Sequence, residues 1–166
     1  AMMIHILSNV PVESRHILFL GSGPVLSSND RFDIEVEGVG CHGAMPSTGV
    51  DPFVAATHIH QGIMTLNSRE IPSDEMLVAS VGALNGGNEF NVIPSTVSMK
   101  GTMRSYNEEI RRYSKERIEE IAKNIAAAFR SNVKMNYSLA NPSLLNDEQL
   151  NNEMRGYCEE LFPGEV

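Results

Sequence analysis

Three polar side chains in this sequence stand beside turns rich in glycine and proline. His42 lies in a Gly-Cys-His-Gly-Ala-Met-Pro stretch, Asn91 begins Asn-Val-Ile-Pro, and Arg104 ends Gly-Thr-Met-Arg. An imidazole and an amide can stabilise a developing negative charge, and a guanidinium group pairs well with a carboxylate. Taken singly, each is more typical of a turn residue or a solvated charge. Together they indicate the substrate-facing edge of a domain whose main chemistry lies elsewhere.

Other kinds of catalytic site are not indicated. The sequence has no His-x-Asp, His-x-x-x-His or paired-cysteine spacing that would predict a complete metal site within the chain. Cys41 adjoins His42, but neighbouring side chains on an extended segment point to opposite sides, which disfavours a Cys-His dyad. No Gly-x-Ser-x-Gly nucleophile motif and no phosphate-binding loop is present.

The composition favours one soluble globular domain. The 166 residues are 42% hydrophobic and 20% charged, with a formal net charge of −8. This negative charge argues against nucleic acid or an anionic membrane as a partner, because both require a basic surface. No apolar run approaches the roughly 20 residues that span a bilayer. Two cysteines far apart in the sequence favour reduced thiols and a cytoplasmic location.

The hydrophobic periodicity predicts an α+β fold. Strands are expected over residues 31–38, 77–86, 97–106 and 133–139, and helices over residues 51–68 and 107–129. The order is therefore β-α-β-β-α-β. With short connections and right-handed crossovers, it predicts a ferredoxin-like sandwich over residues 30–140, in which two helices cover one face of a four-stranded antiparallel sheet.

Capping residues sharpen the helix boundaries. Asp51, followed by proline, predicts the start of the first helix, and Asn107 predicts the start of the second. Asn146, with Gln149 three residues later, resembles a capping box for a further helix over residues 146–162. Two i,i+4 ion pairs are expected on the exposed side of the second helix: Glu108 with Arg112, and Glu119 with Lys123.

Five short motifs occur in a fixed order and in compatible predicted structure. They are Asp30-Arg31-Phe32, Gly40-x-His42-Gly43-Ala44-Met45-Pro46, Gly49-Val50-Asp51-Pro52, Asn91-Val92-Ile93-Pro94 and Gly101-Thr102-Met103-Arg104. With this series, over roughly three quarters of its length, the chain resembles the lid, or dimerisation, domain of the zinc-dependent aminoacylase/carboxypeptidase family. The hippurate-hydrolase-like amidohydrolase branch fits best.

The resemblance implies a role for each candidate residue. In that family the lid is inserted into a catalytic domain with two zinc ions, where a metal-bridging water attacks the amide carbonyl. His42 would stabilise the oxyanion from across a homodimer, and Asn91 would hydrogen-bond the substrate from the same side. Arg104 would pair with the carboxylate of an N-acyl amino acid or small peptide. The first helix and residues 76–84 are the expected pairing surface.

The sequence also departs from the family. The family's His-x-Asp motif, bridging aspartate, glutamate pair and late histidine are not recognisable here, and the resemblance leaves only His5 as a candidate zinc ligand. Residues 1–29 would then be a stub of the preceding catalytic domain, residues 30–140 the lid, and residues 141–166 the return segment. This stretch alone is expected to be inactive.

Two other functions are compatible with a ferredoxin-like fold. One is RNA recognition, which stacks bases on aromatic residues of the open sheet face. The net charge of −8 and the lack of aromatic residues predicted on that face argue against it. The other is a regulatory module that binds a small molecule at a dimer interface without catalysis. It explains the fold but not the five ordered motifs.

Overall fold

The structure is a computed structural model that describes residue 13 and residues 16–166. The chain forms two compact units, Leu26–Leu144 and the combination of Ala1–Val25 with Leu145–Val166. The domain boundaries expected from the sequence, which concern a whole protein, stay a prediction. No helix within the described residues has the length and apolar character needed to cross a membrane.

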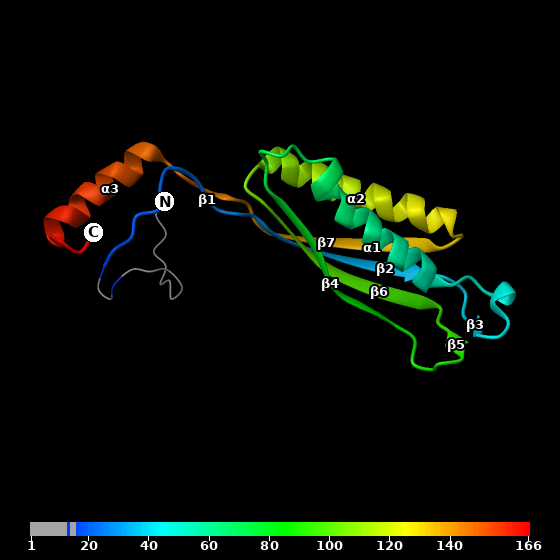
Figure 1. Ribbon diagram of the computed structural model, residues 1–166. Helices are drawn as coiled ribbons and strands as arrows, with labels where there is room; N and C mark the ends of the chain where they lie inside the picture. The colour runs from blue at the N-terminus through cyan, green and yellow to red at the C-terminus, as the bar shows by residue number, and fades with distance from the viewer. Residues whose placement is uncertain (1–12, 14–15) are drawn as a thin grey trace. The chain divides into compact units, whose positions relative to one another are not determined.

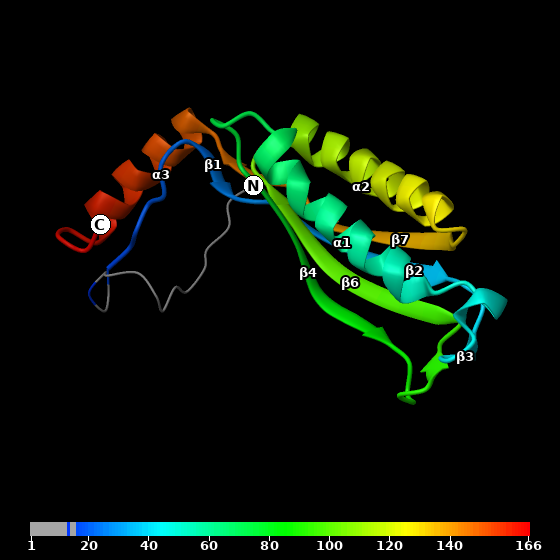
Figure 2. The ribbon, with the colours of Figure 1, turned by 45° about the vertical axis from the view of Figure 1, so that its right-hand side comes forward.

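The larger unit is the expected ferredoxin-like sandwich. Its strands are β2 (Asn29–Glu37), β4 (Leu77–Gly86), β6 (Thr96–Ser105) and β7 (Asn132–Asn141). They form an antiparallel sheet in the order β4-β6-β2-β7. The helices α1 (Pro52–Arg69) and α2 (Glu108–Ala128) lie together on one face of this sheet (Figures 1 and 2). The opposite face has no helix of this unit against it.

Alternation along the central strands builds the core between the sheet and the helices. On β2, Phe32, Ile34 and Val36 are buried, whereas their neighbours in the strand are half-buried or exposed. The other buried apolar residues of the core include Val97, Met99 and Met103 of β6, Ala55, Ile59, Ile63 and Leu66 of α1, and Ile118, Ile121 and Ala122 of α2. The strand period of two and the helix period of 3.6 place these side chains in one layer.

Packing against Phe32 explains why a glycine occupies position 101. It lies opposite Phe32 in the register of β6 with β2, and a Cβ atom at this position would overlap the Phe32 ring. The missing side chain gives the ring its space beside the sheet. This close packing holds the two central strands in one register.

The capping residues predicted for the first two helices are confirmed. The Asp51 carboxylate accepts a hydrogen bond from the Phe53 amide at 2.8 Å, and the Asn107 side chain accepts one from the Glu109 amide at 2.8 Å. Each satisfies an amide that the helix itself leaves without a partner.

The cap predicted for the last helix is wrong by one residue. Helix α3 (Glu148–Leu161) begins after Asp147, whose carboxylate accepts from the Leu150 amide at 2.9 Å. Asn146 instead ends β8 (Leu144–Asn146), which pairs with β1 (Gly23–Leu26). Its side-chain amide donates to the Leu20 carbonyl at 3.3 Å. Because Asn146 is still part of the strand, the next residue, Asp147, caps the helix.

One of the two predicted surface ion pairs is also wrong. Glu119 and Lys123 do pair, at 2.6 Å. Glu108, however, pairs with Arg111 at 2.7 Å, and Arg112 is exposed. Arg111 lies on the inner side of α2, where a carboxylate of the sheet draws it inward. The i,i+3 spacing then brings it to Glu108 as well.

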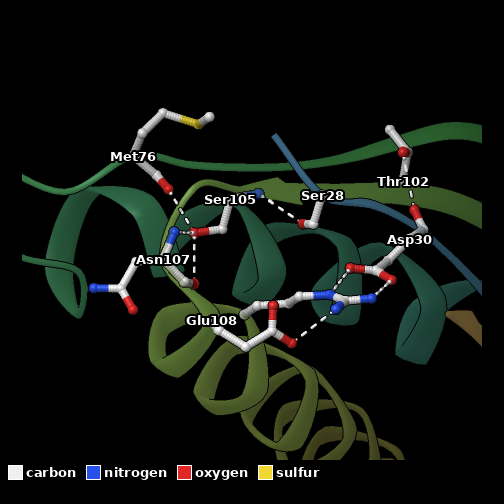
Figure 3. Close-up of polar contacts among 8 residues, drawn as sticks. Ser28, Asp30, Met76, Thr102, Ser105, Asn107 and Glu108 are labelled. Atoms are coloured by element: carbon white, nitrogen blue, oxygen red, sulfur yellow. Dashed lines mark hydrogen bonds and ion pairs between the residues drawn. The ribbon is translucent and has the colours of Figure 1, made fainter. Parts of the chain in front are cut away.

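That carboxylate belongs to Asp30, and the two residues form a buried, two-bonded ion pair (Figure 3). Arg111 Nε donates to Asp30 Oδ2 and Nη2 donates to Oδ1, both at 2.6 Å. The side chains are 8% and 0% exposed. The hydrogen bond with Asp30 is the largest cause that raises the pKa of Arg111, so the guanidinium stays charged inside the fold.

Hydrogen bonds around Ser105 join four segments at the same end of the sheet (Figure 3). The Ser105 amide donates to Ser28 Oγ at 3.0 Å, just before β2. Ser105 Oγ donates to the Met76 carbonyl at 3.0 Å, just before β4, and accepts from the Asn107 amide at 3.1 Å, at the start of α2. The end of β6 is therefore fixed to both strands and to the helix.

Replacing Asp30 with alanine should destabilise the larger unit by about 3–5 kcal/mol, because Arg111 would remain buried without its main partner. The matched control is Lys123→Ala, which breaks the exposed pair with Glu119 and should cost no more than about 0.5 kcal/mol. Urea unfolding followed by circular dichroism measures both. Equal, small losses for the two variants would contradict a structural role for the buried pair.

Candidate functional site

The structure brings two of the candidate residues together beyond one end of the sheet. His42 belongs to the short strand β3 (Cys41–His42), which pairs with β5 (Val92–Ile93) and places His42 opposite Val92. The Gly43 amide donates to the Asn91 carbonyl at 2.7 Å. Both views show this ladder past the end of β2 and the beginning of β6 (Figures 1 and 2). We call this the turn end of the sheet.

His42 and Asn91 each sit in a tight turn that leaves the side chain exposed. The Met45 amide donates to the His42 carbonyl at 2.8 Å, which closes the first turn. The Ala44 amide donates to His42 Nδ1 at 3.1 Å. An Nδ1 that accepts a hydrogen bond assigns the proton of the neutral imidazole to Nε2. His42 therefore presents an N–H donor to the outside, as an oxyanion requires.

The loop that carries His42 is closed on itself at its base. Val39 and Val50 form a two-bonded bridge, with N–O distances of 2.8 and 2.9 Å. Gly49 lies within this bridge, where a Cβ atom would overlap the Val39 carbonyl oxygen and lie 2.6 Å from Cys41 Sγ. The glycine thus permits the close approach that holds the His42 turn in place.

Arg104 lies at the opposite end of the sheet. It stands in β6 opposite Val78 of β4, is half-buried, and follows Met103, which faces the helices. Because strand side chains alternate, Arg104 faces the open side of the sheet. The ion pairs of the described residues do not include it. Among the described residues its guanidinium therefore pairs with no carboxylate, which leaves it available to an anion.

The length of β6 separates the two ends. Eight residue steps lie between Thr96, next to the turn end, and Arg104. At about 3.3 Å per residue, this is about 26 Å. A small substrate cannot reach Arg104 and His42 of the same chain at once. The resemblance implied that His42 and Asn91 reach the substrate from across a homodimer and that Arg104 pairs with its carboxylate. A single chain brings together only His42 and Asn91.

The described part of the chain does not fit a metal pair. Among these residues, no group of three or more His, Cys, Asp or Glu side chains is placed to hold a metal ion. His5, the candidate zinc ligand, lies outside the described residues. Cys41 and Cys158 are free and half-buried.

One residue at the turn end was missed by the sequence analysis. Phe90 precedes Asn91 in the second turn, and its side chain is 99% exposed. The signal in the sequence is a large apolar residue between the polar stretch Gly86-Gly87-Asn88-Glu89 and Asn91. Turn segments of this kind normally consist of polar residues and glycine. An exposed aromatic residue in one is therefore a candidate for a binding role.

Comparison with known proteins identifies related domains. Residues 27–130 match the family model of the M20 peptidase dimerisation domain. The chain is 34% identical over 149 residues to an N-acetyl-L-cysteine deacetylase of Bacillus subtilis, covering 90% of this chain and 36% of that protein. It is 32% identical over 154 residues to a hippurate hydrolase of Campylobacter jejuni, covering 93% of this chain and 40% of that protein.

Solved structures share the fold. A structure from methicillin-resistant Staphylococcus aureus superposes with a TM-score of 0.81 and 23% identity, over 90% of this chain and 40% of that chain. A dinuclear metal-binding peptidase of the M20 family from Bacillus subtilis gives a TM-score of 0.66 and 27% identity, over 86% of this chain and 34% of that chain. The chain thus spans well under half of each of these proteins.

Replacing Gly49 with alanine should loosen the His42 loop without unfolding the sheet, because the new methyl group would push against the Val39 carbonyl. Amide hydrogen exchange should speed up at Val39 and Val50, and stay unchanged at core residues such as Phe32. Gly156→Ala is the control, since a Cβ atom at Gly156 meets nothing within 4 Å. Unchanged exchange at both valines would show that the loop does not need this glycine.

Proposed function

The chain belongs to the M20 peptidase dimerisation domain family, and we propose that it is the lid and dimerisation domain of a metal-dependent amidohydrolase. The substrates would be N-acyl amino acids or small peptides. The support is the family match together with relatives named as a deacetylase and a hippurate hydrolase. Because the chain spans only 36–40% of those two relatives, the activity of the whole protein is part of the proposal.

The observation that carries this proposal is the separation of His42 and Asn91 from Arg104, which forms no ion pair within the described part of the chain. Three groups suited to one small substrate stand at opposite ends of a single sheet. Two chains related by a two-fold axis resolve the difficulty, because each end of one sheet then meets the other end of its partner. One substrate would contact Arg104 of one chain and His42 with Asn91 of the other.

The geometry of β4 makes this arrangement specific. β4 is an edge strand that runs from the Arg104 end, at Leu77, to the turn end, at Gly86. Antiparallel pairing of two β4 edges places Leu77 of each chain near Gly86 of the other. The same pairing therefore brings the turn end of the partner toward Arg104.

The two edges of the sheet differ in their suitability for pairing. The outer edge β7 carries Lys134, which forms an ion pair with Glu37, and a charged edge resists strand addition. The edge β4 instead borders a groove beside α1, lined by Thr57, His60, Gln61, Val81, Gly82, Ala83 and Leu84. The middle of β4 is thus small or apolar, which favours close packing against a second copy.

The three side chains supply binding and charge stabilisation. The Arg104 guanidinium would hold the substrate carboxylate with two parallel hydrogen bonds. The N–H on Nε2 of His42 would donate to the amide oxygen as it becomes negative, and the Asn91 amide would donate beside it. Among the described residues no side-chain group fits a metal pair. Activation of the attacking water would therefore fall to residues of the catalytic domain.

Arg104→Ala in the whole enzyme should lower kcat/KM for a substrate with a free α-carboxylate. The drop should correspond to a loss of about 2–5 kcal/mol of transition-state binding. The neutral amide analogue of the substrate should lose little. Arg31→Ala is the control, because Arg31 lies on the same open face but pairs with Asp33. Equal losses on both substrates would make Arg104 a structural residue.

His42→Ala in the whole enzyme should lower turnover by about 100- to 1000-fold, the usual cost of removing an oxyanion donor. It is then mixed with a second inactive variant that lacks a metal ligand of the catalytic domain. With random exchange of subunits, half of the dimers are mixed and each owns one complete site. Activity should therefore recover to about a quarter of wild type. Exchange without recovery would place His42 outside the partner's site.

A further inference from the structure

Phe90 is an aromatic side chain that the fold of this unit does not use. At 99% exposure it contributes nothing to the core. Two less exposed apolar residues lie close by along the chain, Met45 in the His42 turn at 56% and Val92 in β5 at 49%. Single exposed apolar residues are common on protein surfaces. All three lie in the β3-β5 ladder or the turns beside it, which also carry His42 and Asn91, and we call them the apolar rim.

The backbone under the rim is held without help from Phe90. The Val92 amide donates to the Glu89 carbonyl at 3.5 Å across the Phe90 turn, and Gly43 donates to the Asn91 carbonyl at 2.7 Å. Gly87 makes the preceding bend with φ at +69°, a conformation that favours glycine. The backbone of the turn is therefore held by contacts that do not involve the Phe90 side chain, and this side chain is left exposed.

The proposed site fixes which part of the substrate faces the rim. An N-acyl amino acid has its carboxylate on one side of the amide bond and its acyl group on the other. If Arg104 of one chain holds the carboxylate and His42 of the partner holds the amide oxygen, the acyl group lies on the partner's side. Phe90, adjacent to Asn91, is then beside the acyl group.

We propose that Phe90, with Met45 and Val92, forms the wall that recognises the acyl group of the substrate bound in the partner's site. This inference rests on the proposed function. It predicts a preference for aromatic or bulky aliphatic acyl groups over acetyl, because only the larger groups cover the Phe90 ring and exclude water from it. The exposed carboxylate of Glu89, next to Phe90, disfavours acyl groups that carry a negative charge.

The test compares two substrates of the whole enzyme that differ only in the acyl group, N-benzoylglycine and N-acetylglycine. Phe90→Ala should lower kcat/KM for the benzoyl substrate by about 10- to 100-fold, the range that a few apolar contacts control. It should leave the acetyl substrate within about threefold. Phe90→Leu should retain most of the preference. Tyr113→Ala is the control, an exposed aromatic on α2, and should leave the ratio of the two rates unchanged.

Mixed dimers locate the residue. One chain carries His42→Ala and keeps its metal ligands, and the other has lost a metal ligand but supplies His42. Phe90→Ala on the chain that supplies His42 should remove the benzoyl preference of the restored activity. The same substitution on the His42→Ala chain should leave that preference intact.

The possible failures are distinguishable. If wild type and His42→Ala behave as proposed but Phe90→Ala lowers both substrates equally, or neither, the acyl wall is wrong and the proposed function stands. A benzoyl preference that stays unchanged when Phe90→Ala is placed on the chain that supplies His42 overturns the wall in the same way. If the wild-type enzyme hydrolyses neither substrate and no other N-acyl amino acid, the proposed function fails and the inference fails with it.

Discussion

The buried ion pair of Asp30 and Arg111 is the constraint on which the arrangement of the sheet depends. Such a pair adds little net stability compared with apolar side chains, but it penalises every alternative in which one charge is buried alone. A shift of β2 by one residue would turn Phe32 outward and separate Asp30 from Arg111. The pair therefore favours the one register of β2 against α2 in which Phe32, Ile34 and Val36 all face the helices.

Local patterns predicted the framework, because strand alternation and helix caps depend on residues close in sequence. The ferredoxin-like order, the caps at Asp51 and Asn107 and the buried side of β2 all followed from such patterns. The ion pair between Arg111 and Asp30 was not predicted from such patterns. Its signal was present, since Asp30 has the same parity as Phe32 and Ile34 and must point inward. The rotation of α2 about its axis decides whether Arg111 or Arg112 faces Asp30, and the sequence did not fix that rotation.

The site was predictable as a set of residues but not as a geometry. The pairing of β3 with β5 involves two residues on each side, too few to show alternation, so nothing local indicates that His42 and Asn91 become neighbours. The sequence predicts the length of β6, but the distance between Arg104 and His42 follows only once the order of strands in the sheet is known. Only when β6 is known to lie between β2 and β4, with Thr96 at the turn end, does Arg104 become remote from His42.

The separation of the site residues has a mechanical consequence for the proposed dimer. If two β4 edges pair, the two four-stranded sheets with Arg104 become one continuous sheet, whose hydrogen-bonded strands hold their spacing closely. The β3-β5 ladder with His42 follows directly at the turn end of that sheet. The distance between Arg104 and the partner's His42 is then set by strand register, independently of how either lid sits on its catalytic domain. Carboxylate recognition, oxyanion stabilisation and the acyl wall would move as one rigid body, so lid closure would deliver all three to the substrate together.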